Sequence, residues 1–146
     1  MSGGNPAAVR EALSALLRVR ARSLLELQEI RQILEVEVAG LAAGRAGPED
    51  VRAMREQLER MREQIEAPEG YVDADVEFHA LLARATGNGV LLTMFEPVVE
   101  LLRDSRKVSA SLPGSALRAL EEHERILRCV EPVSYTHLTL PTICSV

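Results

Sequence analysis

Residues 71–87 read YVDADVEFHALLARATG and carry two polar side chains on an apolar helical stripe. The apolar members recur at the three-, four- and seven-residue spacings of one helix face: Tyr71, Phe78, Leu82 and Ala85. Asp75 and His79 fall within or beside that stripe, one turn apart. The pattern predicts a helix that turns a carboxylate and an imidazole towards the side that packs against other helices.

Composition sets the class of protein before any motif is considered. The chain has 146 residues, 47% hydrophobic and 27% charged, which suits a single domain with a real core. The net charge of −5 argues against holding nucleic acid by bulk electrostatics, although a DNA-reading part could lie elsewhere. The sequence has no run of 18 apolar residues, so we expect a soluble cytoplasmic protein that does not enter a membrane.

Six helices are predicted, and short breaks separate most of them. Gly47-Pro48, APEG (67–70), Gly87-Asn88-Gly89 and SLPG (111–114) are typical turn or cap sequences. Pro97 is expected to kink the fifth helix. Because short connections fold neighbouring helices back on each other, we predict an all-α antiparallel helical bundle. The predicted helices cover residues 6–17, 23–44, 48–65, 71–86, 90–108 and 115–130.

Two further helices place polar residues on their apolar seams. Arg31 fills the gap between Leu27 and Leu34 in a seam that also contains Leu24, Val38 and Leu41. His123 sits between Leu120 and Leu127 in a seam that also contains Ala116 and Val130. Four ionisable residues are therefore expected to face the interior of one bundle.

Burying a carboxylate or guanidinium without a partner costs roughly several kcal/mol, so each of these groups needs a partner inside the bundle. A divalent metal would satisfy Asp75, His79 and His123 together, because i and i+4 residues share a helix face. Arg31 would then be a cation for a ligand that bears a carboxylate. Spacing alone leaves other readings open: a satisfied core histidine, a surface Asp75–His79 contact, or an Arg31–Glu35 ion pair.

The motifs resemble the FCD domain, the effector-binding domain of FadR-type GntR transcription regulators. LLELQEIRQILE (24–35), DADVEFHALLARATGN (73–88) and ALEEHERIL (119–127) follow that family's order. The resemblance covers about residues 23–132 and implies an all-α antiparallel bundle that dimerises. Many members hold a divalent metal through one Asp and three His beside a small carboxylate effector. Asp75, His79 and His123 match three of those ligands, and Arg31 matches an arginine often found near the effector.

Both ends of the chain depart from that family pattern. The tail VSYTHLTLPTICSV (133–146) has no charged residue and looks foreign or disordered. It replaces the last helix and its histidine, so we expect a weak site for zinc, nickel or a similar ion. Residues 1–22 resemble the remnant of a winged helix-turn-helix recognition helix, in which Arg10 would meet DNA; a generic amphipathic helix is the alternative. DNA is then expected as a partner only of a complete parent protein.

Three functions follow in order of preference. The first is a non-enzymatic, ligand-sensing domain of a GntR/FadR-type transcription regulator, binding a divalent metal and a small carboxylate metabolite that modulates DNA binding. The second is a metal-dependent enzyme. The sequence argues against it, because the one further carboxylate near Asp75 and His79, that of Glu77, is expected to point away from them. The third is a purely structural bundle whose polar seam residues pair among themselves.

Overall fold

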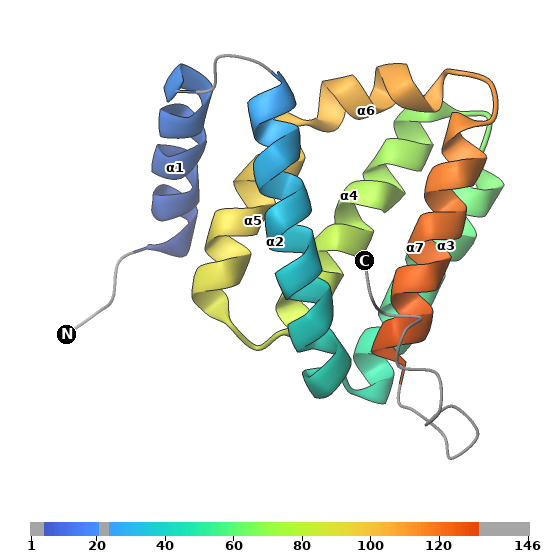
Figure 1. Ribbon diagram of the computed structural model, residues 1–146, viewed down its shortest axis with the longest axis horizontal. Helices are drawn as coiled ribbons and strands as arrows, with labels where there is room; N and C mark the ends of the chain where they lie inside the picture. Colours follow the sequence, from blue (N-terminus) through green and yellow to red (C-terminus); the bar gives the residue numbers. More distant parts are fainter. Residues whose placement is uncertain (1–4, 21–23, 132–146) are drawn as a thin grey trace.

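The computed structural model describes residues 5–20 and 24–131, and in these ranges the chain is all-helical, with no strand. Seven helices follow one another through short connections, as the predicted bundle requires (Figure 1). Their bounds are α1 (Pro6–Arg20), α2 (Leu24–Arg45), α3 (Pro48–Glu63), α4 (Pro68–Ala85), α5 (Gly89–Leu101), α6 (Arg103–Ala110) and α7 (Ser115–Val130).

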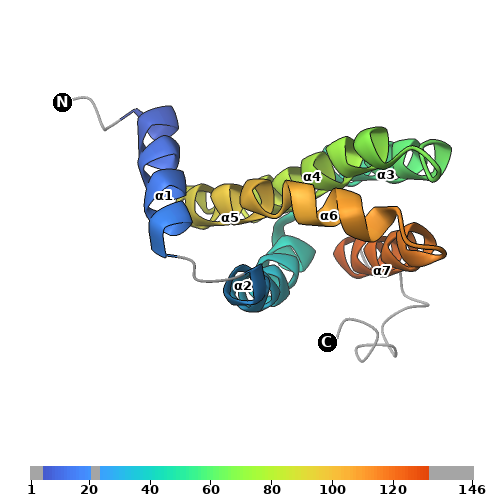
Figure 2. The same cartoon turned by 90° about the horizontal axis from the view of Figure 1, so that it is seen from above.

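The helices form two layers, which Figure 2 shows from above. Helices α5, α4 and α3 lie in a row, and α2 and α7 lie side by side along one side of it. Helix α6 crosses over the upper ends of α4 and α7, and α1 packs against α5 at the outer end of the row (Figures 1 and 2). The middle of the molecule is therefore the space enclosed by α2, α4, α6 and α7.

Local sequence accounts for the sharp helix ends. Pro48 begins α3, and the Asp50 carboxylate accepts a hydrogen bond of 2.9 Å from the Gly47 amide. Gly87, with φ of +67°, follows the end of α4 in the left-handed conformation that glycine adopts without steric cost. The Asn88 side chain then caps α5 by accepting from the Leu91 amide. These three helix boundaries confirm the predicted ones.

Two predicted elements need correction. Helix α4 begins at Pro68 and not at Tyr71, because proline suits the first helical position and the following Glu69 suits the helix N-terminus. The single kinked helix predicted for residues 90–108 is two helices separated at Leu102. Residues 89–101 are strongly apolar and 103–110 are strongly polar, so the two segments pack in different environments and the chain turns between them.

The predicted seams mostly form the core. Buried apolar side chains come from α2, α3, α4, α5 and α7, and a second small cluster joins α2 and α5. Leu24 is an exception, since it is 53% exposed near the start of α2 and is not a seam residue. The predicted stripe residues of α4 and α7 are all buried: Tyr71, Phe78, Leu82, Ala85, Ala116, Leu120, Leu127 and Val130.

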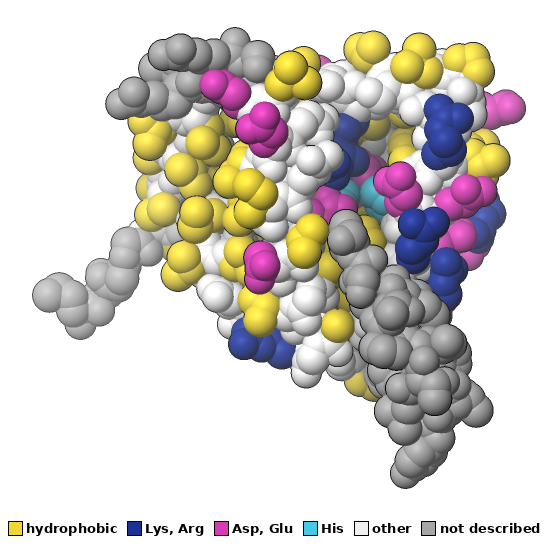
Figure 3. Space-filling model, in the orientation of Figure 1, with side chains coloured by type: hydrophobic (Ala, Val, Ile, Leu, Met, Phe, Trp, Pro, Cys, Tyr) yellow, Lys and Arg dark blue, Asp and Glu magenta, His cyan; other side chains and the backbone are white. Residues whose placement is uncertain are grey.

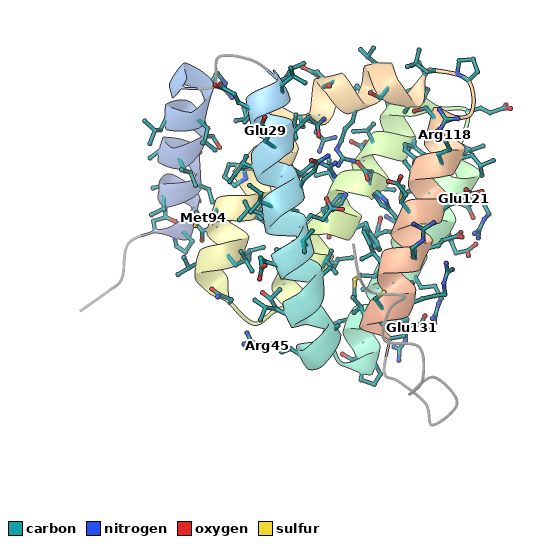
Figure 4. The ribbon with its side chains drawn as sticks, viewed as in Figure 1. Glu29, Arg45, Met94, Arg118, Glu121 and Glu131 are labelled. Atoms are coloured by element: carbon teal, nitrogen blue, oxygen red, sulfur yellow. The ribbon has the colours of Figure 1, made fainter. Side chains whose placement is uncertain are left out.

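Polar contacts fix the helices that surround the centre. The Tyr71 hydroxyl of α4 donates a buried hydrogen bond of 2.7 Å to the Ala116 carbonyl of α7. At the other end of the bundle, Arg45, which Figure 4 labels near the end of α2, donates a hydrogen bond of 2.7 Å to the Thr86 carbonyl. Arg55 of α3 pairs with Glu131 just after α7. The two hydrogen bonds connect α7 and α2 to α4, and the ion pair connects α3 to the end of α7.

The structure leaves the assignments at the chain ends as predictions. The foreign-looking tail, residues 133–146, lies outside the described residues. In the described part of residues 1–22, α1 is an amphipathic helix packed against α5, which both interpretations of this segment share. None of the helices in the described ranges is both long enough and apolar enough to cross a bilayer.

Candidate metal centre

Helix α4 presents Asp75 and His79 to the middle of the bundle. One helical turn separates them, and their side chains are 1% and 0% exposed. The Asp75 Oδ1 and His79 Nε2 atoms are 3.4 Å apart. Glu77, between them in sequence, pairs with Arg84 and is 45% exposed, so it points away as predicted. The same helix therefore separates a buried polar pair from its charged outer face.

His123 joins this pair from α7. Its side chain is buried, and its ring stacks on Phe78 with a centroid separation of 5.0 Å. The His79 and His123 rings meet edge to face at 4.8 Å. Neighbouring charged residues of α7, such as Arg118 and Glu121, are exposed on its outer side (Figure 4). The inward position of His123 thus follows from the apolar seam that it interrupts.

The three side chains converge as the sequence predicts. One possible ligand atom from each of Asp75, His79 and His123 lies within 4.8 Å of the others. Figure 3 shows histidine and acidic side chains at the bottom of a hollow between α2 and α7. Two imidazoles and one carboxylate form a donor set suited to zinc and neighbouring divalent transition metals.

The Asp75 carboxylate divides its two oxygens between different partners. Its Oδ1 contacts His123 Nε2 and faces His79 Nε2, while its Oδ2 accepts a hydrogen bond from Arg106 Nη1 of α6. Burial by itself would raise the pKa of Asp75. The Arg106 guanidinium and the hydrogen bond from His123 outweigh burial and hold that pKa well below its ordinary value. Asp75 is therefore an anion at neutral pH.

His79 supplies the observation that tests whether a metal fits. Both of its ring nitrogens are buried, and neither has a hydrogen-bond partner among the described residues. Burial lowers the pKa of His79 despite the nearby carboxylates of Glu35 and Asp75, so the ring is neutral and a lone pair is available. A neutral imidazole without a partner, beside an ionised carboxylate and a second imidazole, fits a divalent cation.

Glu35 of α2 stands on the other side of the His79 ring. Its Oε2 lies 3.8 Å from His79 Nδ1 and 2.7 Å from Arg31 Nη1. Although burial would raise the pKa of Glu35, its electrostatic interactions with His79 and with the Arg31 guanidinium lower it. A carboxylate in this place can orient the imidazole that it faces.

Arg31 lies close to the cluster of Asp75, His79 and His123 but contacts none of these three residues directly through the bonds that its guanidinium makes. The Arg31 guanidinium bonds to Glu35 and, through Nε, to the Gln28 side chain at 3.1 Å. The ion pair with Glu35 is thus formed, as one reading of the sequence allowed. The expected contact between Arg31 and an effector stays a prediction.

Sequence reasoning did not assign Glu35 or Arg106 to the site. Glu35 carried a signal, because it lies one turn after Arg31 on the same helix face. Arg106 carried none, since it is 31 residues from Asp75 in sequence and lies on a polar helix with no buried residue.

Arg10 lies far from the cluster, on α1. Its Nη1 is 3.4 Å from Glu96 Oε2 of α5, and its side chain is 40% exposed. It lines a cleft of about 380 Å³ between α1, α4 and α5, to which none of the three candidate ligands contributes. The role of Arg10 in DNA binding stays a prediction.

Comparison with known proteins identifies the domain. The family model described as "FCD domain" matches residues 26–132, which include all three candidate ligands. The chain is also similar to the HTH-type transcriptional regulator LutR of Bacillus subtilis (strain 168), with 33% identity over 127 residues. That alignment covers 84% of this chain and 58% of LutR, so the chain spans less than two thirds of that relative's length. No solved structure matches the chain. On the family match, this chain belongs to the FCD domain family.

Proposed function

We propose that this chain is the ligand-sensing domain of a GntR-type, FadR-like transcription regulator. Asp75, His79 and His123 hold a divalent transition metal, and a small carboxylate effector binds beside it. The observation that carries the metal site is the burial of His79 next to an ionised Asp75, with no hydrogen-bond partner for either ring nitrogen within residues 5–20 and 24–131. An unpaired buried polar atom is costly unless a partner is supplied.

DNA and a second copy of the chain are the expected partners of the complete protein. Effector binding changes DNA affinity only if the effector prefers one arrangement of the protein over another. Apolar side chains, including Leu25, Ile33 and Leu16, are exposed over α1 and α2 (Figure 3). Such a surface is compatible with the homodimer that the family resemblance implies. Similarity to LutR, an HTH-type transcriptional regulator, supports the DNA-binding role.

A purely structural cluster is the second candidate, and one contact favours it. Arg106 already neutralises Asp75, so the carboxylate has a counter-charge without any metal. That pairing leaves His79 unsatisfied, which is why we prefer the metal site. The family match and the relative's name favour a regulator over the alternative of a metal-dependent enzyme.

The experiment is a calorimetric titration of zinc or nickel into chain that has been stripped with a chelator. We expect about one ion per chain, with affinity at least about tenfold weaker in Asp75→Asn and His79→Gln, since each variant loses a direct ligand. Glu77→Gln is the matched control, because this residue lies on α4 but faces outwards. Absence of metal uptake, or equal affinity in His79→Gln and Glu77→Gln, would establish the structural alternative.

A further inference from the structure

Arg106 approaches the candidate metal centre from above, on α6, and touches only one side of the Asp75 carboxylate. Its Nη1 donates to Asp75 Oδ2, while Oδ1 faces the two imidazoles. Its side chain is 15% exposed. Arg106 can therefore stay bound to Asp75 while Oδ1 serves another partner.

The contact with Asp75 involves Nη1 alone among the nitrogens of the Arg106 guanidinium. Its Nε is buried and has no hydrogen-bond partner among the described residues. In a planar guanidinium, Nε and Nη2 share one edge, and that edge binds a carboxylate through two parallel hydrogen bonds. A buried donor with no partner is unfavourable, so this edge is suited to a partner that enters from outside the chain.

The neighbouring arginines, Arg31 and Arg103, already bind other residues of the chain. Arg31 uses both Nε and Nη1 on Gln28 and Glu35. Arg103, one turn before Arg106 on α6, is bound by Asp73 and Glu100. Of these three arginines, Arg106 combines direct contact with the cluster and an unpaired buried donor.

The balance of charges around the site predicts whether the ligand is an anion or a cation. Two acids, Asp75 and Glu35, are each paired with one arginine, Arg106 and Arg31 respectively. A divalent ion would leave this buried group with excess positive charge. Excess charge in a poorly hydrated site favours an anion beside it.

We propose that Arg106, rather than Arg31, recognises the effector, by offering Nε and Nη2 to the carboxylate group of a small organic acid while Nη1 holds Asp75. This inference rests on the proposed function, because the excess charge exists only when the metal is bound. It makes Arg106 a ligand-binding residue and Arg31 the partner that fixes Glu35.

The test uses cobalt(II) as the metal and acetate as the probe, with acetamide as the uncharged match. Acetate binding to the cobalt-loaded chain is measured from the paramagnetic relaxation of its methyl protons. We expect Arg106→Gln to bind cobalt at least as tightly as wild type, since a nearby positive charge is removed. It should bind acetate about tenfold more weakly or worse, the change expected when charge-assisted hydrogen bonds are lost. Acetamide should bind poorly to every form.

Two further variants keep the test decisive. Arg106→Lys keeps a positive charge beside Asp75, so it should fold even if Arg106→Gln does not. It lacks the two parallel donors of the guanidinium edge, so it should also bind acetate weakly. Arg103→Gln is the matched control on α6 and should bind acetate like wild type. Wild-type acetate affinity in both Arg106 variants overturns the inference alone. Failure of the wild-type chain to take up cobalt overturns the proposed function and the inference with it.

Discussion

At the scale of the residue, the centre is defined by how each buried polar atom is satisfied. Both carboxylate oxygens of Asp75 have partners, whereas neither ring nitrogen of His79 has a hydrogen-bond partner in the part of the chain that the structure describes. Asp75, His79 and His123 could be predicted from sequence, because each interrupts or adjoins an otherwise apolar helical stripe. Arg106 could not, because its contact with Asp75 depends on where α6 crosses the bundle.

The buried, neutral His79 predicts how stability depends on pH. Below pH 6.5, the ordinary pKa, the unfolded chain binds a proton at this side chain, whereas the folded chain, with its lowered pKa, does not. Protons therefore favour unfolding. As the pH is lowered, this group should decrease the free energy of unfolding by at most about 1.4 kcal/mol per pH unit. The loss continues until the pH reaches the lowered pKa of the folded state.

Urea unfolding of the metal-free chain at about pH 7.5 and about pH 5.5 measures this dependence. His79→Gln, which cannot be protonated, should show a smaller difference between the two conditions than wild type. Asp75 and Glu35, whose pKa values are lowered in the folded chain, stay ionised between these two pH values, so the difference between the two proteins reports His79. An identical pH dependence in the two proteins would mean that His79 is not buried in its neutral form.

At the scale of the element, the division between α5 and α6 brings Arg106 to the cluster. The sequence predicted one helix over residues 90–108 with a kink at Pro97. The structure keeps Pro97 inside α5 and begins a separate helix, α6, after Leu102, where the apolar run ends. The direction of α6 depends on its packing across α4 and α7, which no local pattern encodes.

Leu102 should therefore be important for stability. It is fully buried at the junction and packs with Leu27 and Val98. Leu102→Ala should lower the free energy of unfolding by about 2–4 kcal/mol, through lost burial and the cavity left behind. Leu117→Ala, at a position 52% exposed, should change it by less than about 0.5 kcal/mol. Denaturant unfolding of the two variants compares them, and equal losses would show that the junction is not tightly packed.

At the scale of the whole molecule, four helices meet at the centre. Helix α4 gives the carboxylate and one imidazole, α7 gives the second imidazole, α2 gives Glu35 with Arg31, and α6 gives Arg106. Short connections were enough to predict an all-α bundle. They could not show which helices enclose the polar centre, because that depends on the packing of segments far apart in sequence.

X-ray absorption at the zinc edge of the zinc-loaded chain tests the central claim most directly. The account predicts a first shell of nitrogen and oxygen at about 2.0–2.1 Å, with outer-shell scattering typical of imidazole that declines in His79→Gln and His123→Gln. A first shell dominated by sulfur at about 2.3 Å, or imidazole scattering unchanged by both substitutions, would contradict it.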